Sequence, residues 1–260
     1  MAPTYEVWTE RRRSSDRTPW CSFFLPSPVA EAPSHRVRTF HARRGRLGDA
    51  HREALAALVG RWGLEPAGER LDLSETFGRA APVVVDIGCG MGESTRAQAA
   101  GAPDAGIIAI DVHTRGIATL LRQVEHDGLT NVRVVLGDAV EFLDQRISDG
   151  ALAGARIYFP DPWPKARHRK RRLVQPDFAA LMVDKLAPDA FVHCATDDME
   201  YADQMLAVLT AEPRLHNPFD GFAPRSIPGV LDRPVTKYER RARRLGQPVR
   251  DVWVTRRLPT

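Results

Sequence analysis

The chain has 260 residues, of which 43% are hydrophobic, which is enough to bury one substantial core. No stretch approaches the roughly 18 consecutive apolar residues of a membrane-spanning helix, and no apolar run near the N-terminus is typical of a signal peptide. We therefore expect a cytoplasmic protein with no membrane partner. The 37 lysines and arginines against 33 acidic residues give a net charge of +4, which only weakly indicates a polyanionic partner.

The first part of the chain differs in composition from the rest. Residues 1–35 carry scattered proline, serine and arginine without a sustained period, and we interpret them as a flexible N-terminal extension. Residues 36–260 are expected to form the single folded domain, with basic extensions. Within it, apolar side chains at helical spacing predict a helix over residues 49–62. Proline and glycine residues between 66 and 78 then predict a loop.

From residue 82 onward, short apolar runs alternate with helical stretches, which is typical of a parallel sheet built from βαβ units. The predicted strands are residues 83–87, 106–110, 132–136, 155–159 and 190–195. The predicted helices are residues 94–100, 115–126, 139–147, 177–186 and 199–211. A last strand-like segment, residues 249–255, follows a long loop over residues 217–234. The pattern predicts an α/β fold with a doubly wound, mostly parallel sheet and helices on both faces.

The first predicted strand runs into a turn containing Gly88, Gly90 and Gly92, where missing side chains let a ligand approach the backbone. A dinucleotide-binding loop has the spacing GxGxxG, whereas this one reads GxGxG and is followed by Glu93, whose carboxylate would repel phosphates. S-adenosylmethionine has no phosphate and carries positive sulfonium and ammonium groups, so a loop containing Asp86 and Glu93 suits it better. The spacing favours S-adenosylmethionine and makes an NAD-dependent oxidoreductase improbable.

Acidic residues also end the next two predicted strands. Asp111 lies about 20 residues past the loop, where a carboxylate can accept both ribose hydroxyls of a nucleoside. Asp138 follows the third strand and can accept from an adenine amino group in the same crevice. The alternative is that each aspartate caps the following helix, and for one aspartate alone capping is the commoner role. Asp86, Asp111 and Asp138 beside one glycine turn favour cofactor binding.

The fourth predicted strand stops at a proline-rich loop that contains Asp161. Prolines on both sides of Asp161 hold the backbone in an extended form. Because the loop lies at the carboxyl edge of the sheet, we expect Asp161 to point into the crevice near the transferable methyl group, with Trp163 available to stack on a base. Asp161 is therefore the candidate catalytic residue.

A basic run follows Asp161 directly, with six lysines or arginines in the eight residues 165–172. A charge run alone is more often a solvated face, but its attachment to a catalytic-looking loop favours contacts to RNA phosphates. The expected RNA-binding residues are Arg167, His168, Arg169, Lys170, Arg171 and Arg172. Two more clusters extend the predicted footprint: Arg36, Arg38, Arg43, Arg44 and Arg46, and then Lys237, Arg240, Arg241, Arg243 and Arg244. After the fifth strand, either one of Asp197 and Asp198 contacts the substrate base or both cap the next helix.

The block FPDPWPKARH at residues 159–168, continued by KRRLVQ at 170–175, resembles the bacterial TrmB family, the tRNA (guanine-N7)-methyltransferases. The resemblance spans about residues 38–256. It is joined in the expected order by RRGRL at 43–47, ATD at 195–197, RPVTKYERR at 233–241 and RLG at 244–246. The family often has Glu at the positions of Asp86 and Asp111 and Phe at that of Tyr238. Both changes keep charge or aromaticity, so we expect the function to survive.

The resemblance implies a Rossmann-like class I S-adenosylmethionine-dependent methyltransferase with a seven-stranded sheet. It implies cofactor contacts at Asp86, Asp111, Asp138 and Asp161, with Asp161 also the catalytic residue. It places substrate contacts at Lys165, Asp197, Thr236, Lys237, Tyr238 and Glu239, and RNA contacts at residues 167–172. The implied reaction methylates the variable-loop guanine of tRNA, conventionally position 46. Guanine N7 has a lone pair and no proton to lose, so the lack of an obvious strong base is compatible with this target.

Two other functions remain open from the residues. A polar residue followed by proline and an aromatic at the fourth strand also occurs in methyltransferases that act on amino groups of RNA, DNA or protein amides, although those usually have a doubled proline. A non-catalytic RNA-binding protein would need only the basic clusters, and the intact acidic residues argue against it. We expect no metal, because the three cysteines lack the spacing of a zinc site. For the assembly we expect a monomer or a homodimer.

Overall fold

The computed structural model describes residues 39–40, 47–227, 230 and 232–258. The predicted N-terminal extension and the first predicted basic cluster, from Arg36 to Arg46, lie outside these residues.

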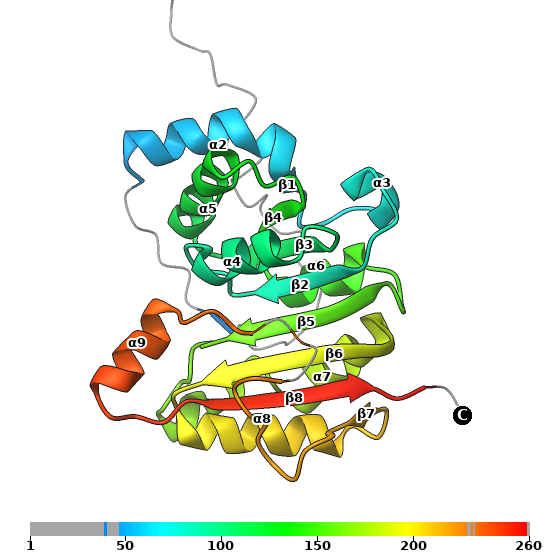
Figure 1. Cartoon of the computed structure of the whole chain (residues 1–260), viewed down its shortest axis with the longest axis vertical. Helices are drawn as coiled ribbons and strands as arrows, with labels where there is room; N and C mark the ends of the chain where they lie inside the picture. The colour runs from blue at the N-terminus through cyan, green and yellow to red at the C-terminus, as the bar shows by residue number, and fades with distance from the viewer. Residues whose placement is uncertain (1–38, 41–46, 228–229, 231, 259–260) are drawn as a thin grey trace, which may run out of the picture. The chain divides into compact units, whose positions relative to one another are not determined.

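One eight-stranded sheet forms the centre of the described part of the chain, in the order β1-β4-β3-β2-β5-β6-β8-β7 (Figure 1). The strands are β1 (Gly63–Leu64), β2 (Val83–Ile87), β3 (Gly106–Asp111), β4 (Val132–Leu136), β5 (Leu152–Tyr158), β6 (Leu186–Thr196), β7 (Leu215–His216) and β8 (Arg250–Arg256). Neighbouring strands from β1 through to β6 are parallel. β8 is antiparallel to both β6 and β7. The predicted doubly wound, mostly parallel sheet is confirmed, with eight strands where seven were expected.

The central strands form because their sequences suit a sheet that is covered on both sides. Every residue of β2 and of β3 is buried, in runs rich in valine and isoleucine. Such continuous apolar runs are typical of parallel strands with helices on both faces. The short strand β1 pairs only Gly63 and Leu64 with β4, so it has no periodicity by which the sequence could reveal it.

The helices are α2 (Asp49–Trp62), α3 (Leu73–Phe77), α4 (Glu93–Gly101), α5 (Thr114–His126), α6 (Ala139–Arg146), α7 (Pro176–Lys185), α8 (Met199–Ala211) and α9 (Lys237–Arg244), with one 3-10 helix, η1 (Ala166–Arg171). α2 and α4 pack against α5, whereas α7 packs against α6 and α8. Right-handed crossovers that run in opposite directions from β2 place these two groups on opposite faces of the sheet. No helix among the described residues is long and apolar enough to cross a membrane.

The strand order reverses at β2, which lies between β3 and β5. In doubly wound sheets, ligands bind in the crevice that opens at the carboxyl ends of the strands at this switch point. The arrows of β2, β5 and β6 point toward the same end of the sheet, and α9, in orange, lies at that end (Figure 1). The fold therefore brings the glycine turn after β2, the loop after β5 and a helix from late in the chain to one edge.

Candidate active site

The glycine turn after β2 keeps open space beside its backbone. Gly88, Gly90 and Gly92 have φ values of +77°, +59° and +80°, which favour glycine. A Cβ atom at Gly88 or Gly90 would meet nothing within 4 Å, whereas one at Gly92 would lie 2.3 Å from Cδ1 of Leu120. The first two glycines thus leave room for a ligand, and the third lets α4 pack closely against α5.

Asp111 connects this turn to β3. Its Oδ2 atom accepts a hydrogen bond from the backbone N–H of Gly90 at 2.7 Å, and its Oδ1 atom accepts one from that of His113 at 2.8 Å. Oδ1 also lies 3.2 Å from Nδ1 of His113, and the second lone pair of Oδ2 remains as acceptor capacity for a ligand. Asp111 therefore holds the glycine turn in shape and lies beside it, and its predicted contact to a ribose stays a prediction.

The other two strand-end aspartates lie in different settings. Asp86 is buried and accepts a 2.6 Å hydrogen bond from the hydroxyl of Thr95. Burial raises the pKa of Asp86, and the Thr95 bond opposes that rise. Asp138 is the N-cap of α6 and accepts from the backbone N–H of Val140 at 2.9 Å. For Asp138, capping of the following helix is the observed role.

A pocket lies at this edge of the sheet, lined by three segments. They are the glycine turn with the start of α4 (Asp86, Gly88, Cys89, Gly90, Met91, Glu93 and Ser94), the end of β5 (Tyr158 and Phe159) and the start of α9 (Thr236, Lys237 and Tyr238). The Oγ atom of Ser94 is buried and has no hydrogen-bond partner among the described residues. An unpartnered buried hydroxyl beside two open glycines fits a small polar ligand such as the predicted cofactor.

The loop that carries Asp161 leaves the pocket from Phe159. Asp161 is exposed, and no hydrogen bond or ion pair to its carboxylate occurs within the described part of the chain. Trp163 is buried: its Nε1 donates to the carbonyl of Thr39 at 3.1 Å, and its ring contacts those of His168 and, by cation–π stacking, the Arg171 guanidinium. The expectation that Trp163 stacks on a base is therefore wrong, because its ring anchors the loop.

Comparison with known proteins decides the family. Residues 80–252 match a family described as "Putative methyltransferase". The tRNA (guanine-N(7)-)-methyltransferase of Streptomyces avermitilis is 48% identical over 91% of this chain and 82% of its own length. The enzyme of the same name from Bordetella parapertussis is 45% identical over 88% of this chain and 89% of its own. The chain belongs to the tRNA (guanine-N7)-methyltransferase family. The sequence-based assignment to this family is thereby confirmed.

A solved structure supports the fold of the methyltransferase. The 16S rRNA methyltransferase KamB matches with a TM-score of 0.52 over 74% of this chain and 96% of its own, at 17% identity. At that identity the likeness shows the fold alone, and it agrees with the predicted class I architecture.

In the present chain, the predicted basic run at residues 165–172 folds into η1, and most of its side chains face outward. Lys165, Arg167, Arg169 and Lys170 are exposed, and Arg169 pairs with Glu200 at 2.6 Å. His168 and Arg171 are half-buried and pack on Trp163.

Arg172 departs from the predicted RNA contacts. Its side chain is only 1% exposed. Its Nε donates to the carbonyl of Pro162 at 2.7 Å, and its Nη1 donates to Gln204 and to Glu200 on α8. The guanidinium thus fastens the Asp161 loop to α8, and this burial favours a structural role for Arg172 over the predicted RNA contact, which stays a prediction.

The aspartates after β6 divide between the two roles left open by the sequence. Asp198 is the N-cap of α8 and accepts from the backbone N–H of Tyr201 at 2.8 Å. Asp197 is half-buried, and its carboxylate has no hydrogen bond or ion pair within the described residues. Asp197 is the one that remains available for the substrate.

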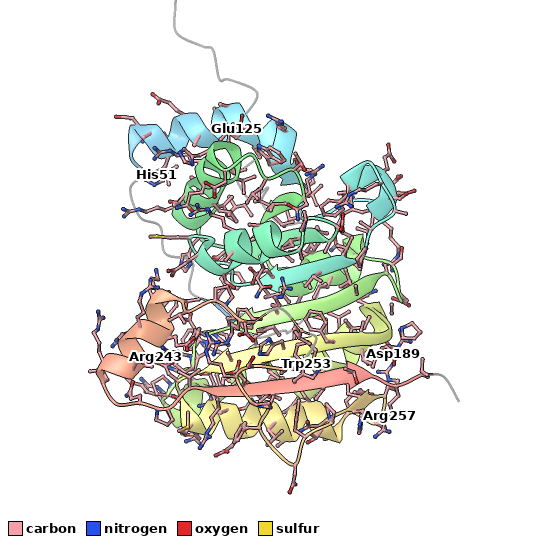
Figure 2. All side chains as sticks on the ribbon, in the orientation of Figure 1. His51, Glu125, Asp189, Arg243, Trp253 and Arg257 are labelled. Atoms are coloured by element: carbon pink, nitrogen blue, oxygen red, sulfur yellow. The ribbon has the colours of Figure 1, made fainter. Side chains whose placement is uncertain are left out.

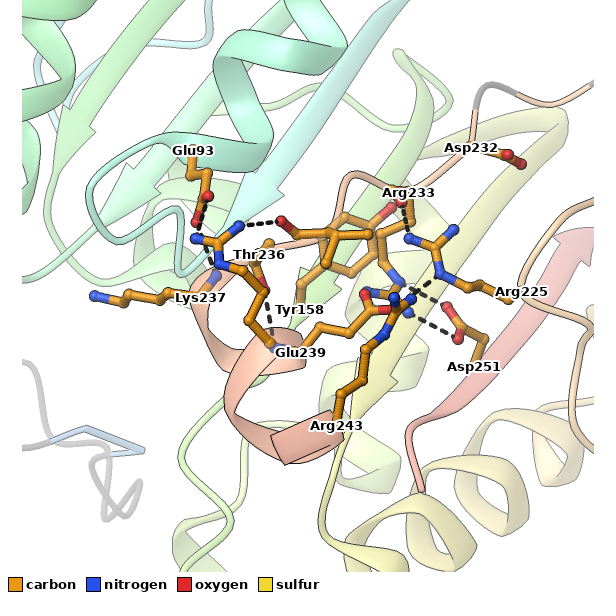
Figure 3. Close-up of polar contacts among 12 residues, drawn as sticks. Glu93, Tyr158, Arg225, Asp232, Arg233, Thr236, Lys237, Glu239, Arg243 and Asp251 are labelled. Carbon is orange, nitrogen blue, oxygen red and sulfur yellow. Dashed lines mark hydrogen bonds and ion pairs between the residues drawn. The ribbon is translucent and has the colours of Figure 1, made fainter. Parts of the chain in front are cut away.

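The segment from Thr236 to Glu239 also divides. Thr236 caps α9, and its Oγ1 accepts from the backbone N–H of Glu239 at 3.4 Å. Tyr238 is exposed and stacks on Phe159 with ring centroids 5.7 Å apart, and Lys237 lies over its ring. Glu239 is buried and pairs with Arg225, Arg233 and Arg243 (Figure 3). The carboxylate of Glu239 holds three arginines in this structure, and its predicted contact to the substrate stays a prediction.

Glu93 also differs from its predicted setting. Glu93 lines the pocket with Gly88 and Gly90, but its carboxylate is already bound by groups of α9 (Figure 3). The sequence identifies Arg240 only as one member of a basic cluster. Its ion pair with Glu93 could not be predicted, because the two residues are 147 positions apart and no local pattern connects them.

Proposed function

We propose that this protein transfers the methyl group of S-adenosylmethionine to N7 of guanine in the variable loop of tRNA, at the position conventionally numbered 46. The observation that carries the proposal is that three segments line one pocket at the edge of the sheet. They are the open glycine turn, the end of β5 that leads to Asp161, and the start of the basic helix α9. The names of the relatives, which are 44–49% identical to this chain, support the substrate.

The cofactor is expected in the pocket after β2. Gly88 and Gly90 leave space for it, Oδ2 of Asp111 offers a free lone pair for a ribose hydroxyl, and the Ser94 hydroxyl is free to bond a polar group of its amino acid part. Bound there, S-adenosylmethionine supplies a methyl group activated by its sulfonium. Asp86 and Asp138 would then act mainly by holding α4 and α6 in place around it.

Asp161 is expected to orient the base. A carboxylate that accepts hydrogen bonds from guanine N1–H and the exocyclic amine aligns N7 with the methyl group and stabilises the positive charge of the product. The exposed carboxylate of Asp161 and the half-buried one of Asp197 are free to do this within the described residues. Lys165 follows Asp161 on the same loop, and Lys237 and Tyr238 belong to the pocket wall. These three residues complete the proposed substrate contacts.

The tRNA backbone is expected along η1 and α9. Arg167, Arg169 and Lys170 present charge on the same loop as Asp161, and Lys237, Arg241 and Arg244 are exposed on α9. Phosphate contacts of this kind fix the register of the RNA without reading its sequence. We place the methyltransferase domain at residues 36–260 and expect it to work in the cytoplasm as a monomer or homodimer.

The test uses unmodified tRNA transcripts and a methyl-labelled donor, with the product mapped by chain cleavage specific for 7-methylguanine. We expect cleavage at one variable-loop guanine, and no label in a transcript that carries adenine there. Asp161→Ala should lower the rate at least about 100-fold, because one lost transition-state contact of this type costs that much, while tRNA affinity changes little. Label without cleavage would indicate an amino-methyltransferase, and full activity of Asp161→Ala would remove Asp161 from its role.

A further inference from the structure

A row of buried polar groups joins the end of β5 to the late part of the chain. The hydroxyl of Tyr158 lies 2.9 Å from Nδ1 of His193 on β6. The Nε2 atom of His193 lies 2.8 Å from Oδ1 of Asp251 on β8. All three side chains are buried, and the ring of His193 also packs edge-on against Trp253, which is labelled in Figure 2.

The positions of the protons in this row follow from burial and charge. Burial lowers the pKa of His193 even though the bond to Asp251 opposes that shift, so the imidazole is neutral at pH 7. Burial would raise the pKa of Asp251, but bonds from His193 and Arg233 keep it low. A neutral His193 therefore donates from Nε2 to the Asp251 carboxylate and accepts the Tyr158 hydroxyl at Nδ1. One orientation of each group satisfies the whole row.

Arg233 joins this row to α9. Its side chain has no exposed surface. Its Nε and Nη2 donate to the two oxygens of Asp251 at 2.8 and 3.0 Å, and its Nη1 donates to Glu239 at 2.5 Å (Figure 3). Both fixed partners come from late in the chain, one on β8 and one on α9.

The same guanidinium lies against the aromatic end of β5. Its carbon is 5.7 Å from the ring centroid of Tyr158 and 5.5 Å from that of Phe159. Phe159 has a φ of +52°, a region that non-glycine residues adopt only when their surroundings hold them there. The contacts that hold it include the guanidinium of Arg233 and the stacked ring of Tyr238.

We propose that Arg233 is a positioning residue for methyl transfer. Held by Asp251 and Glu239, it fixes the Tyr158–Phe159 end of β5 and thereby the starting point of the loop that presents Asp161 two residues later. Arg233 itself lies outside the set of residues that line the cofactor pocket, whereas Tyr158 and Phe159 belong to that set. This inference rests on the proposed function, because it assigns Arg233 to the same reaction.

The test separates positioning from stability by three variants. Arg233→Lys keeps the charge but cannot make the paired bonds to Asp251, and a displacement of about 1 Å at the reacting groups can cost about 100-fold in rate. Tyr158→Phe removes only the hydroxyl of the row. Lys185→Met is the matched control, because Lys185 is also buried and ion-paired, to Asp149, but lies at the end of α7, away from the pocket lining.

The measurements are the single-turnover methyl-transfer rate at saturating tRNA and S-adenosylmethionine, the tRNA Kd and the Tm. We expect the rate to fall about 100-fold in Arg233→Lys and several-fold in Tyr158→Phe, with the tRNA Kd nearly unchanged. Lys185→Met should lower the Tm and keep the wild-type rate at a temperature where it is folded. If Arg233→Lys does not fold, the single-turnover rate of Tyr158→Phe decides whether the row of buried polar groups positions the loop.

Wild-type rates in both site variants, or an equal loss of rate in Lys185→Met, would overturn the positioning role. Methylation of a different base by the wild type would overturn the proposed function alone, because the ratio of variant to wild-type rates still tests Arg233.

Discussion

The carboxylate of Glu93, a residue of the pocket lining, binds the guanidinium of Arg240 on α9. Its Oε1 atom accepts from Nη2 of Arg240 at 2.6 Å, and its Oε2 atom accepts from the backbone N–H of Lys237 at 2.8 Å. Glu93 is the first residue of α4 and Lys237 is the first residue of α9. One side chain thus links the cofactor turn to the basic helix and places a negative charge at the N-terminus of α9, where the helix dipole favours it.

A double-mutant cycle measures this link. Both side chains are about half exposed, so we expect Glu93→Gln and Arg240→Gln each to lower the free energy of unfolding modestly, with a coupling energy of about 0.2–1 kcal/mol. Urea unfolding of the wild type, both single variants and the double variant gives the value. A coupling energy of zero would mean that the contact contributes nothing in solution.

The basic loop offers two neighbouring positions with opposite settings. Lys170→Gln should weaken tRNA binding and reduce the slope of log K against log salt by about one, because it removes one exposed phosphate contact. Arg172→Gln should leave that slope unchanged and lower the free energy of unfolding by about 1–3 kcal/mol, since it leaves the carbonyl of Pro162 and the side-chain oxygen of Gln204 without a donor. Binding titrations over a salt series, with urea unfolding of both variants, check the contrast. The same salt slope in both variants would contradict the outward orientation of Lys170 and the inward orientation of Arg172.

Two glycines of the cofactor turn should respond differently to alanine. In Gly92→Ala the new methyl would overlap Leu120, and its φ of +80° adds strain, so we expect a loss of about 2–4 kcal/mol in stability. In Gly90→Ala the methyl points into open space, so the stability loss should be about 1–2 kcal/mol from backbone strain alone. The larger effect of Gly90→Ala should be on S-adenosylmethionine affinity, which calorimetric titration measures. Wild-type affinity in folded Gly90→Ala would mean that the cofactor does not occupy that space.

Stability should fall on mild acidification because of His193. Its pKa in the folded protein is lowered from an ordinary value of 6.5, chiefly by burial, so below that pH the unfolded chain binds a proton that the folded protein does not. Stability therefore decreases as the pH falls from about 6.5 toward the lowered pKa, by at most about 1.4 kcal/mol per pH unit for one proton. Urea unfolding at pH 7.5, 6.5 and 5.5 measures the slope. His193→Gln should be less stable at pH 7.5 but should lose this part of the slope, and an unchanged slope would assign it to other groups.

The sheet could be predicted from the sequence because its central strands are short apolar runs between helical stretches. Val83 to Ile87 and Gly106 to Asp111 are buried on both faces, so apart from Asp86 and Asp111 their residues are apolar or glycine, and the order of strands and helices then leaves few topologies. The acidic strand ends were found for the same reason, since parallel strands all end at one edge. What that reasoning could not decide was the partner of each carboxylate, as the capping by Asp138 and the free acceptor capacity of Asp111 show.

The helix α9 and the burial of Arg172 lay beyond local patterns. α9 has the sequence KYERRARR, and the residues that it buries are Glu239 and Ala242, so it has no apolar stripe to indicate a helix. Arg172 is preceded by three other basic residues and looks like them in the sequence. Both depend on ion pairs to residues far along the chain, which charge counts do not reveal.

Asp251 has a consequence for the order in which the enzyme becomes active. The strand β8 that carries it is the last of the sheet to be synthesised, and at about 5–20 residues per second the ribosome finishes the glycine turn several seconds earlier. Until β8 inserts beside β6, Arg233 has no bidentate acceptor and His193 has no carboxylate to fix its tautomer. The pocket wall formed by Thr236, Lys237 and Tyr238 is itself synthesised only shortly before β8, so the cofactor pocket and the group that positions the Asp161 loop are both completed at the end of synthesis.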